Sequence, residues 1–319
     1  MSFVLFFVLC LLLAPQSKVQ STKYEAQRST TMPSRPTIAL ALSGGAARGL
    51  AHVGVLRALQ EHDLPIDYIA GTSAGSIVGG AFAAGMSIDE IEALGRGLRW
   101  RDIGRVTMSR LGFQSNERLE QFVRERLPKC RFEELPIPLA VVATDLKTGA
   151  AVVMRDEGDV PFAIRASCAI PGWYVPVVDK DGRQLVDGGL VAVVPVSVAR
   201  SMGADIVVAV DVNFEGATFL GSSSTSVVGV VLQSMLVVQK TASHYQRKSA
   251  DYVISPRVGH IRWDEMGRAA ELMAAGYEAG RDSIPGLQAL IERTIAEQPK
   301  WYQLRRKKKA LKEPLELPG

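Results

Sequence analysis

The stretch that decides the fold reads Ile69-Ala70-Gly71-Thr72-Ser73-Ala74-Gly75. Its last five residues fit the pattern G-x-S-x-G, in which a nucleophilic serine occupies a sharp turn between a strand and a helix. The short apolar run Ile66–Ala70 predicts the strand, and the small residues of Ala74–Ala84 predict the helix. The two flanking glycines would remove contacts that a Cβ makes in so tight a turn. We therefore predict that Ser73 is a nucleophile; a plain turn with Ser73 as helix N-cap is the alternative.

A second glycine-rich turn, Ser43-Gly44-Gly45-Ala46-Ala47-Arg48-Gly49, follows the apolar run Thr37–Leu42 and precedes a helix expected over Leu50–His62. Such a loop exposes consecutive backbone N–H groups to an anion. The dinucleotide pattern G-x-G-x-x-G fails because alanine stands at position 46, and no G-x-x-x-x-G-K-[ST] occurs here. The remaining interpretation is an oxyanion hole. Arg48 would add positive charge there or, alternatively, form a salt bridge that holds the loop.

A candidate base for the serine lies in the segment Val186-Asp187-Gly188-Gly189, where two glycines form a tight turn beside the aspartate. An α/β-hydrolase order of Ser, Asp and His would require His244 or His260. Neither lies in a strand-end loop with turn residues around it. We therefore predict that Asp187 acts directly as the base. A conventional Ser-His-Asp esterase acting on soluble esters is the alternative, and its histidine would be one of the four in the chain: His52, His62, His244 and His260.

Together these motifs resemble the patatin-like phospholipase family, especially its bacterial branch related to neuropathy target esterase. The glycine-rich turn, the serine pentapeptide and Asp187-Gly188-Gly189 follow each other in the family's order. A fourth segment, Ala166–Gly172, resembles the family stretch before the aspartate strand. The resemblance is strong over residues 37–210 and continues more weakly to about 285. One departure is Ala46, where the family usually has a third glycine; alanine keeps its N–H but is disfavoured at positive φ.

The resemblance implies an α/β, three-layer patatin-like fold with a mostly parallel central sheet covered by helices on both faces. It implies a Ser-Asp dyad in which Ser73 is the nucleophile and Asp187 the general base. The substrates would be acyl esters of phospholipids, lysophospholipids or neutral lipids, cleaved through an acyl-enzyme without cofactor or metal. A non-catalytic lipid-binding member is a further alternative. The oxyanion site would be formed by Gly44, Gly45, Ala46 and Arg48.

The hydrophobic pattern also predicts alternating strands and helices, which is typical of a mostly parallel sheet covered on both faces. The segment Gly216–Ser226, rich in Gly, Ser and Thr, is expected to be a mobile loop, and Ser87 begins a helix with a capping box. Further strands are expected at Leu139–Thr144, Ala151–Met154, Ile206–Asp211 and Tyr252–Ser255. Further helices are expected at Asn116–Leu127, Val160–Ser167, Val227–Ser249, Asp264–Ser283 and Leu287–Glu297.

Composition excludes several classes of protein. Among 319 residues, 47% are hydrophobic and 22% are charged, which excludes collagen-like and disordered chains. The longest uncharged apolar run, Phe3 to Ala14, is shorter than the roughly 20 residues of a spanning helix, which excludes a polytopic membrane protein. The three cysteines are too few for a disulfide framework and show no metal-ligand spacing.

The net charge of +4 is concentrated at the two ends of the chain. Residues 300–319 carry seven basic and two acidic side chains, and residues 17–36 carry four basic and one acidic, which leaves −4 on residues 37–299. The body therefore offers no basis for nucleic-acid binding. The basic tail, residues 298–319, is expected to be a solvated tail or to tether the enzyme to anionic membrane through residues 300–312.

The remaining expectations concern domain limits and location. Residues 1–16 have the apolar character of a signal peptide or of an uncleaved anchor, and residues 17–36 read as a polar linker. The catalytic domain is expected over residues 37–297, with its motif core at about 38–210. A true signal peptide would place the protein in the cell envelope or periplasm, and a start at Met32 would place it in the cytoplasm. The sequence leaves the oligomeric state open.

Overall fold

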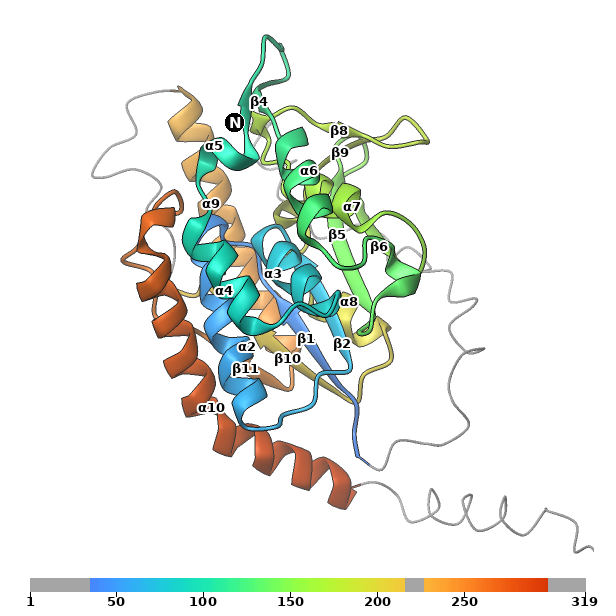
Figure 1. Ribbon diagram of the computed structural model, residues 1–319, viewed down its shortest axis with the longest axis vertical. Coiled ribbons are helices and arrows are strands. Elements are labelled where there is room, and N and C mark those ends of the chain that lie inside the picture. Colours follow the sequence, from blue (N-terminus) through green and yellow to red (C-terminus); the bar gives the residue numbers. More distant parts are fainter. Residues whose placement is uncertain (1–34, 216–226, 298–319) are drawn as a thin grey trace, which may run out of the picture. The chain divides into compact units, whose positions relative to one another are not determined.

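The computed structural model describes residues 35–215 and 227–297, and a mostly parallel β-sheet lies at its centre (Figure 1). The strand order is β11-β10-β1-β2-β5-β9-β8, and β6 also pairs with β5. Strands β11, β10, β1, β2 and β5 are parallel, whereas β6 and β9 run antiparallel to β5, and β8 antiparallel to β9. These strands are β1 (Ile38–Leu42), β2 (Tyr68–Thr72), β5 (Leu139–Asp145), β6 (Ala151–Arg155), β8 (Val177–Val178), β9 (Gln184–Asp187), β10 (Ile206–Val210) and β11 (Tyr252–Ile254).

Helices connect and cover these strands. The α-helices are α2 (Ala51–Glu61), α3 (Ala74–Ala83), α4 (Ile88–Gly97), α5 (Trp100–Ile103), α6 (Glu117–Arg126), α7 (Val160–Ser167), α8 (Val196–Ser201), α9 (Val227–Gln246) and α10 (Ala269–Glu297). The 3-10 turns are η2 (Ala46–Leu50), η3 (Phe132–Glu134), η4 (Gly188–Leu190), η5 (Arg247–Ser249) and η6 (Met266–Arg268). Most expected elements are present within two residues of their expected bounds.

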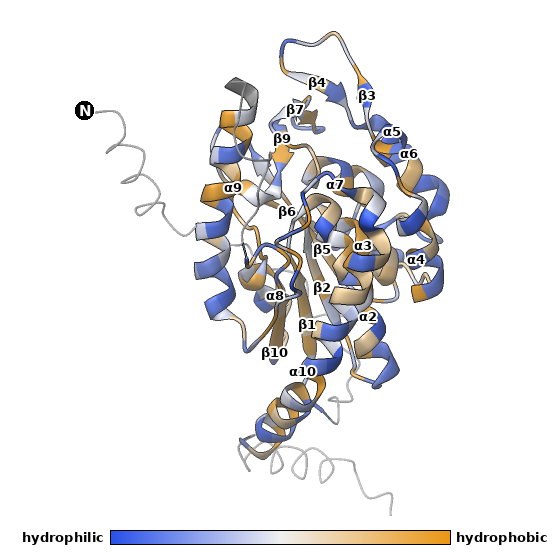
Figure 2. Ribbon diagram, turned by 90° about the vertical axis from the view of Figure 1, so that its left-hand side faces the viewer, coloured by the Kyte–Doolittle hydropathy of each residue, from blue (hydrophilic) through white to orange (hydrophobic). Residues whose placement is uncertain are grey.

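The two faces of the sheet carry side chains of different size, because successive residues of a strand point to opposite sides. In β1, Ile38, Leu40 and Leu42 enter a large core completed by α2, α3, α4, α6, α7 and α10. Ala39 and Ala41 face the opposite side, where α8 and a residue of α9 pack (Figure 2). The expected α/β fold, with a mostly parallel sheet between helices, is therefore confirmed.

One expectation about elements was wrong, and one small sheet was not expected. The closing segment is one helix, α10, and Pro285 lies inside it rather than between two helices. The carbonyl that Pro285 deprives of a donor belongs to Arg281, an exposed residue. The sequence pattern also missed a second sheet of three short strands: β3 (Arg105–Val106), β4 (Gly112–Ser115) and β7 (Gly172–Tyr174).

Several expectations fall outside the described residues, namely the apolar leader, most of the linker, the segment Gly216–Ser226 and the basic tail. The last two residues of the expected linker already belong to the fold, because Pro36 is buried and Arg35 forms an ion pair with Asp67 at 2.7 Å. Within residues 35–215 and 227–297, no helix has the length and apolar character needed to cross a bilayer.

Candidate active site

Ser73 occupies the turn between β2 and α3 in a strained conformation, with φ 49° and ψ −123°. A Cβ on Gly71 would lie 2.7 Å from the carbonyl oxygen of Gly75, and one on Gly75 would lie 2.3 Å from that of Leu42. Both distances are to backbone atoms, which a side-chain rotation cannot relieve. The two glycines are therefore required by close packing around the serine, and the expected strand-turn-helix is present.

Ser73 and Asp187 meet because their strands lie on either side of β5. Thr72 at the end of β2 is opposite Val142, and Asp187 at the end of β9 is opposite Ala143, the next residue of β5. The two side chains therefore reach the same level of the sheet. The hydroxyl of Ser73 donates to Oδ2 of Asp187 at 2.7 Å, and both residues are buried.

The carboxylate of Asp187 sits in a desolvated position. Burial raises its pKa to about 6, although the hydroxyl of Ser73 and the N–H of Gly189, which donates to Oδ1 at 2.7 Å, favour the charged form. The backbone of Asp187 is fixed by Thr144, whose hydroxyl donates to the Asp187 carbonyl at 2.9 Å. An aspartate of this pKa is largely ionised at pH 7 and is a stronger base than an ordinary one.

A serine that the sequence left without a role fixes the backbone of the nucleophile. The N–H of Ser73 donates to Oγ of Ser167 at 2.8 Å, and the hydroxyl of Ser167 donates to the carbonyl of Val142. Ser76 adds a third contact, since its hydroxyl donates to the Ser73 carbonyl at 2.6 Å. Ser167 lies in the segment Ala166–Gly172, so that family-like segment was the available signal.

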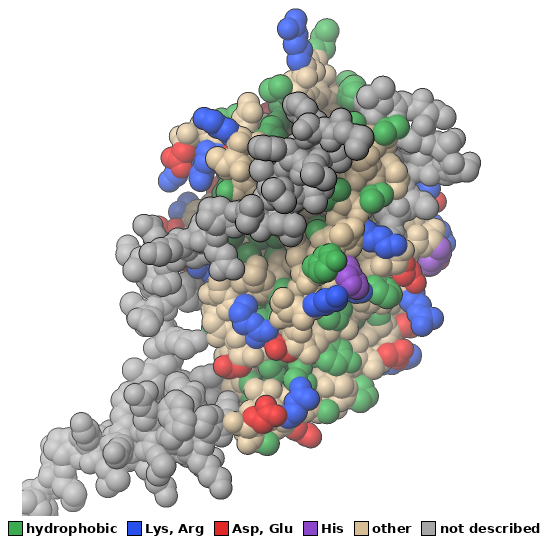
Figure 3. All heavy atoms as spheres, turned by 180° about the vertical axis from the view of Figure 1, so that it is seen from behind, with side chains coloured by type: hydrophobic (Ala, Val, Ile, Leu, Met, Phe, Trp, Pro, Cys, Tyr) green, Lys and Arg blue, Asp and Glu red, His purple; other side chains and the backbone are tan. Residues whose placement is uncertain are grey.

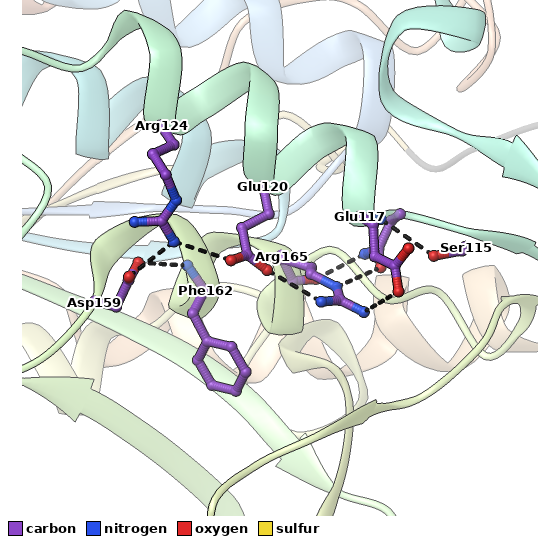
Figure 4. A network of polar contacts seen from close by, with 8 residues as sticks. Ser115, Glu117, Glu120, Arg124, Asp159, Phe162 and Arg165 are labelled. Atoms are coloured by element: carbon purple, nitrogen blue, oxygen red, sulfur yellow. Dashed lines mark hydrogen bonds and ion pairs between the residues drawn. The ribbon is translucent and has the colours of Figure 1, made fainter.

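Helix α7, which ends at Ser167, is held by a network of ion pairs with α6 (Figure 4). Glu120 accepts from Arg124 at 2.9 Å and from Arg165 at 3.0 Å. Asp159 caps α7 by accepting the N–H of Phe162 at 3.0 Å, and it also accepts from Arg124 at 2.8 Å. The network thus fixes the helix that positions the backbone contact of Ser73.

The glycine-rich turn offers fewer free donors than expected. The N–H of Gly44 donates to the carbonyl of Val193 at 3.0 Å, and the carbonyl of Gly44 accepts from the side-chain amide of Asn213. Gly44 therefore anchors the loop, and its N–H is already engaged. In the described part of the chain, no acceptor takes the N–H of Gly45 or of Ala46. These two groups are the available donors for an anion.

Arg48 connects this turn to another part of the protein. It is 1% exposed, and its Nε donates to the carbonyl of Ile261 at 2.8 Å. Burial lowers the pKa of the guanidinium, and the charge of Glu215 opposes that shift. Arg48 therefore anchors the turn to the loop after β11, and it also lines the pocket beside Ser73.

Ala46 adopts φ 50°, the left-handed conformation that favours glycine. The departure from the family pattern noted in the sequence thus falls at a residue where a Cβ is strained. In the described residues, the N–H of this strained residue has no partner.

Ser73 lies between two cavities that share Ala46, Ser73 and Ile170. The first cavity is partly open to solvent and brings the dyad together with polar and aromatic groups. Trp173 and Trp263 form one wall, with ring centroids 5.8 Å apart. The rest of its lining comprises Gly44, Gly45, Arg48, Asp187, Gly189, Val193, Asn213, Leu232, Met235, Leu236 and Gln239.

The second cavity lies between α3 and α5 and contains no charged side chain. Leu50, Ile77, Val78 and Leu98 line both this cavity and a third one. The lining of the third cavity is apolar except for Arg126. Two neighbouring apolar cavities therefore lie on this side of Ser73, the further one beneath α4 and α6.

The four histidines contact other groups. His52 is buried, its Nε2 lies 2.9 Å from the carbonyl of Ser43, and burial lowers its pKa to about 4. His62 lies against the carbonyl of Ala58, and His260 pairs with Glu271. His244 lies on α9 beside Tyr245 and Arg247. Within the described residues, these contacts leave Asp187 as the partner of Ser73, and no group of three or more His, Cys, Asp or Glu is arranged to hold a metal ion.

The family model described as patatin-like phospholipase matches residues 40–200, which include all three motifs of this site. The chain belongs to the patatin-like phospholipase family. A family relative described as an uncharacterized NTE family protein of Mycobacterium tuberculosis is 42% identical over 183 residues, which cover 56% of this chain and 50% of the relative. Human patatin-like phospholipase domain-containing protein 6 is 34% identical over 286 residues, which cover 78% of this chain and 20% of the human protein.

Among solved structures, VipD from Legionella pneumophila has a TM-score of 0.54 and 15% sequence identity, covering 83% of this chain and 68% of VipD. This similarity shows the patatin-like fold. The present chain spans about half the length of the mycobacterial relative and a fifth of the human one.

Proposed function

We propose that this patatin-like protein is a serine acyl hydrolase that cleaves carboxylic esters of lipids, of the lipase, phospholipase or lysophospholipase type. The observation that carries the proposal is the 2.7 Å hydrogen bond from Ser73 Oγ to the buried carboxylate of Asp187. Family membership supports lipid esters as the substrate class.

In the first half-reaction, Asp187 accepts the proton of Ser73 as Oγ attacks the ester carbonyl. The N–H groups of Gly45 and Ala46 stabilise the oxyanion, and the guanidinium of Arg48 adds positive charge nearby. The intermediate collapses, and the departing alcohol or lysolipid takes the proton from Asp187. In the second half, Asp187 accepts a proton from water, the hydroxide attacks the acyl-Ser73 ester, and the fatty acid leaves as Ser73 regains its proton.

The two cavities suggest how the substrate lies. The apolar cavities between α3 and α5 and beneath α4 and α6 suit an acyl chain, because hydrophobic side chains make up most of their lining. The cavity with Asn213 and Gln239 suits the alcohol part of the ester, which carries oxygen atoms that need hydrogen-bond partners. The acyl carbonyl would then lie between Ser73 and Ala46, where the cavities meet.

The test is a panel of phospholipids, lysophospholipids and triacylglycerols incubated with the purified full chain. The wild type should release fatty acid, and Ser73→Ala should release none, whereas Ser234→Ala, at an exposed serine of α9, should match the wild type. A fluorophosphonate should label the wild type but not Ser73→Ala. Labelling with hydrolysis of soluble esters alone would indicate an esterase, and no labelling would indicate a non-catalytic lipid-binding protein.

Our proposals for membrane attachment and cellular location rest on the sequences at the two ends of the chain. We propose that residues 300–312 add electrostatic attraction to anionic membrane, because they are rich in Lys and Arg. The apolar leader supports a cell-envelope or periplasmic location, and translation from Met32 would instead give a cytoplasmic enzyme. Fractionation of cells expressing the chain from either start distinguishes the two.

A further inference from the structure

The hairpin formed by β3 and β4 exposes large apolar side chains to solvent. Val106 is 79% and Met108 106% exposed, and Leu111 and Phe113 are each more than half exposed. These four residues lie within eight positions of each other. An apolar cluster of this kind on a protein surface marks a place where another apolar phase or molecule binds.

The same hairpin carries positive charge without compensation. Arg105 precedes the tip and Arg110 lies in it, and both are exposed. No acidic residue occurs between Ile103 and Asn116. Neither arginine forms an ion pair with any described residue. The surface therefore combines apolar groups with unneutralised cations, which is the combination that binds an anionic lipid surface.

The base of the hairpin is fixed, so that its tip projects from a rigid support (Figures 1 and 2). β4 pairs in parallel with β7, with Gln114 opposite Tyr174. A Cβ on Gly112 would lie 2.6 Å from the carbonyl carbon of Tyr174, so the two strands are in close contact. Ser115, at the end of β4, accepts the N–H of Glu117 at 3.3 Å and so joins the network of Figure 4.

Residues next to the hairpin, in β7 and just before β3, line both cavities at Ser73. Trp173 of β7 lines the first cavity, and its neighbour Tyr174 lines the apolar one. Ile103, two residues before β3, also lines the apolar cavity. In Figure 3 the hairpin stays at the top of the view, where blue and green side chains project together. A surface bound by this tip would therefore lie next to the cavities.

We propose that residues 105–113 insert their apolar tip into an anionic phospholipid bilayer, with Arg105 and Arg110 at the headgroup phosphates. Membrane binding by this hairpin goes beyond the proposed hydrolysis, and it acts in addition to any attraction by residues 300–312. It would bring the cavity walls formed by Ile103, Trp173 and Tyr174 to the lipid surface, so that an ester can leave the bilayer without crossing water.

The experiment measures binding of the full chain to vesicles of ether-linked phosphatidylcholine and phosphatidylglycerol. These lipids contain no carboxylic ester that the protein could hydrolyse. Met108→Ser with Leu111→Ser should weaken binding by about 10-fold or more, because two apolar side chains leave the bilayer. Arg105→Gln with Arg110→Gln should weaken binding to these vesicles and leave weak binding to pure phosphatidylcholine unchanged. Ile295→Ser and Arg293→Gln, on the last turns of α10, are the matched controls and should bind as the wild type does.

Met108→Trp should retain binding, since it keeps an apolar tip suited to the interface. All variants should keep the wild-type melting temperature, because the substituted side chains are exposed. Equal binding by the Met108→Ser, Leu111→Ser variant and the wild type would overturn the proposal. So would a change of oligomeric state in that variant with vesicle binding intact, because the hairpin would then be an interface between copies. Hydrolysis of a soluble ester is measured in parallel, so that the two proposals can fail separately. A variant that loses vesicle binding but still hydrolyses the soluble ester supports the role of the hairpin. A protein that binds vesicles but does not hydrolyse the ester contradicts only the proposed hydrolysis.

Discussion

Ser73 donates a 2.7 Å hydrogen bond to Asp187 although 114 positions separate the two in the chain. The contact exists because β2 and β9 flank the same strand, β5, and end at the same level of it. The geometry leaves no room for a histidine between them. A direct Ser-Asp pair of this kind makes predictions that a triad does not.

Asp187→Asn should reduce kcat on a soluble ester by about 10³-fold or more, because an amide cannot accept the proton of Ser73. The amide oxygen can still accept from Gly189 N–H, so the variant should fold. Initial rates and thermal unfolding measure the two effects. His52→Gln and His260→Gln serve as comparisons, and retention of a tenth of wild-type turnover by Asp187→Asn would contradict the dyad.

Activity and stability should respond to pH in opposite directions. Asp187 must be ionised to act as base, so kcat/KM, which reports the free enzyme, should rise with pH through about 6, the raised pKa of its carboxyl. For stability, the folded state holds the proton up to about pH 6, whereas the unfolded state loses it near 4. The stabilising contribution of the proton is therefore complete below pH 4 and is lost as pH rises to 6.

The control for this pH effect is Asp187→Asn, which cannot titrate at that position. Relative to the wild type, its free energy of unfolding should improve by about 2 kcal/mol between pH 4 and pH 7, because two pKa units correspond to nearly 3 kcal/mol and part of the effect is already present at pH 4. Urea unfolding at the two pH values measures the difference. A difference that does not change with pH would show that Asp187 has an ordinary pKa.

Local sequence was sufficient to predict the serine turn and the aspartate, because each is defined by glycines within two positions. Local sequence was insufficient to predict which N–H groups are free to donate at the proposed oxyanion site. The N–H of Gly44 donates to the carbonyl of Val193, a residue that only the folded chain brings beside it. The same holds for Ser167, whose contact with Ser73 depends on the packing of α7 against β5.

The second sheet was missed for a different reason. Strands β3, β4 and β7 have two to four residues each and are mostly not buried, so burial imposes no apolar alternation on them. Their pairing is set by Gly112 and by the close approach of β4 to β7. Pro285 misled the prediction because a proline usually ends a helix, whereas α10 continues through it. The carbonyl left without a donor belongs to the exposed residue Arg281.

Ala46→Gly should stabilise the protein by about 1 kcal/mol. The alanine is held at φ 50°, which costs an L-residue about 1–2 kcal/mol, and glycine recovers most of this despite its greater freedom in the unfolded chain. Ala47→Gly is the matched control. Its side chain is 1% exposed and its φ is not positive, so that change should destabilise. Denaturant unfolding of the two variants should move in opposite directions, and equal destabilisation would mean that Ala46 is not strained.

Ile77→Phe should shorten the acyl chain that the enzyme accepts. Ile77 lies on α3 and lines both apolar cavities, so a larger side chain there reduces the space that a long acyl chain could fill. We expect kcat/KM for a long-chain p-nitrophenyl ester to fall by about 10-fold relative to a four-carbon ester, which needs less of that space. Ile77→Leu conserves side-chain volume and should keep the wild-type ratio. Leu236→Phe, in the other cavity, should change both esters equally, because they share the same alcohol part. An unchanged ratio in a folded Ile77→Phe variant would show that the acyl chain takes a different path from Ser73.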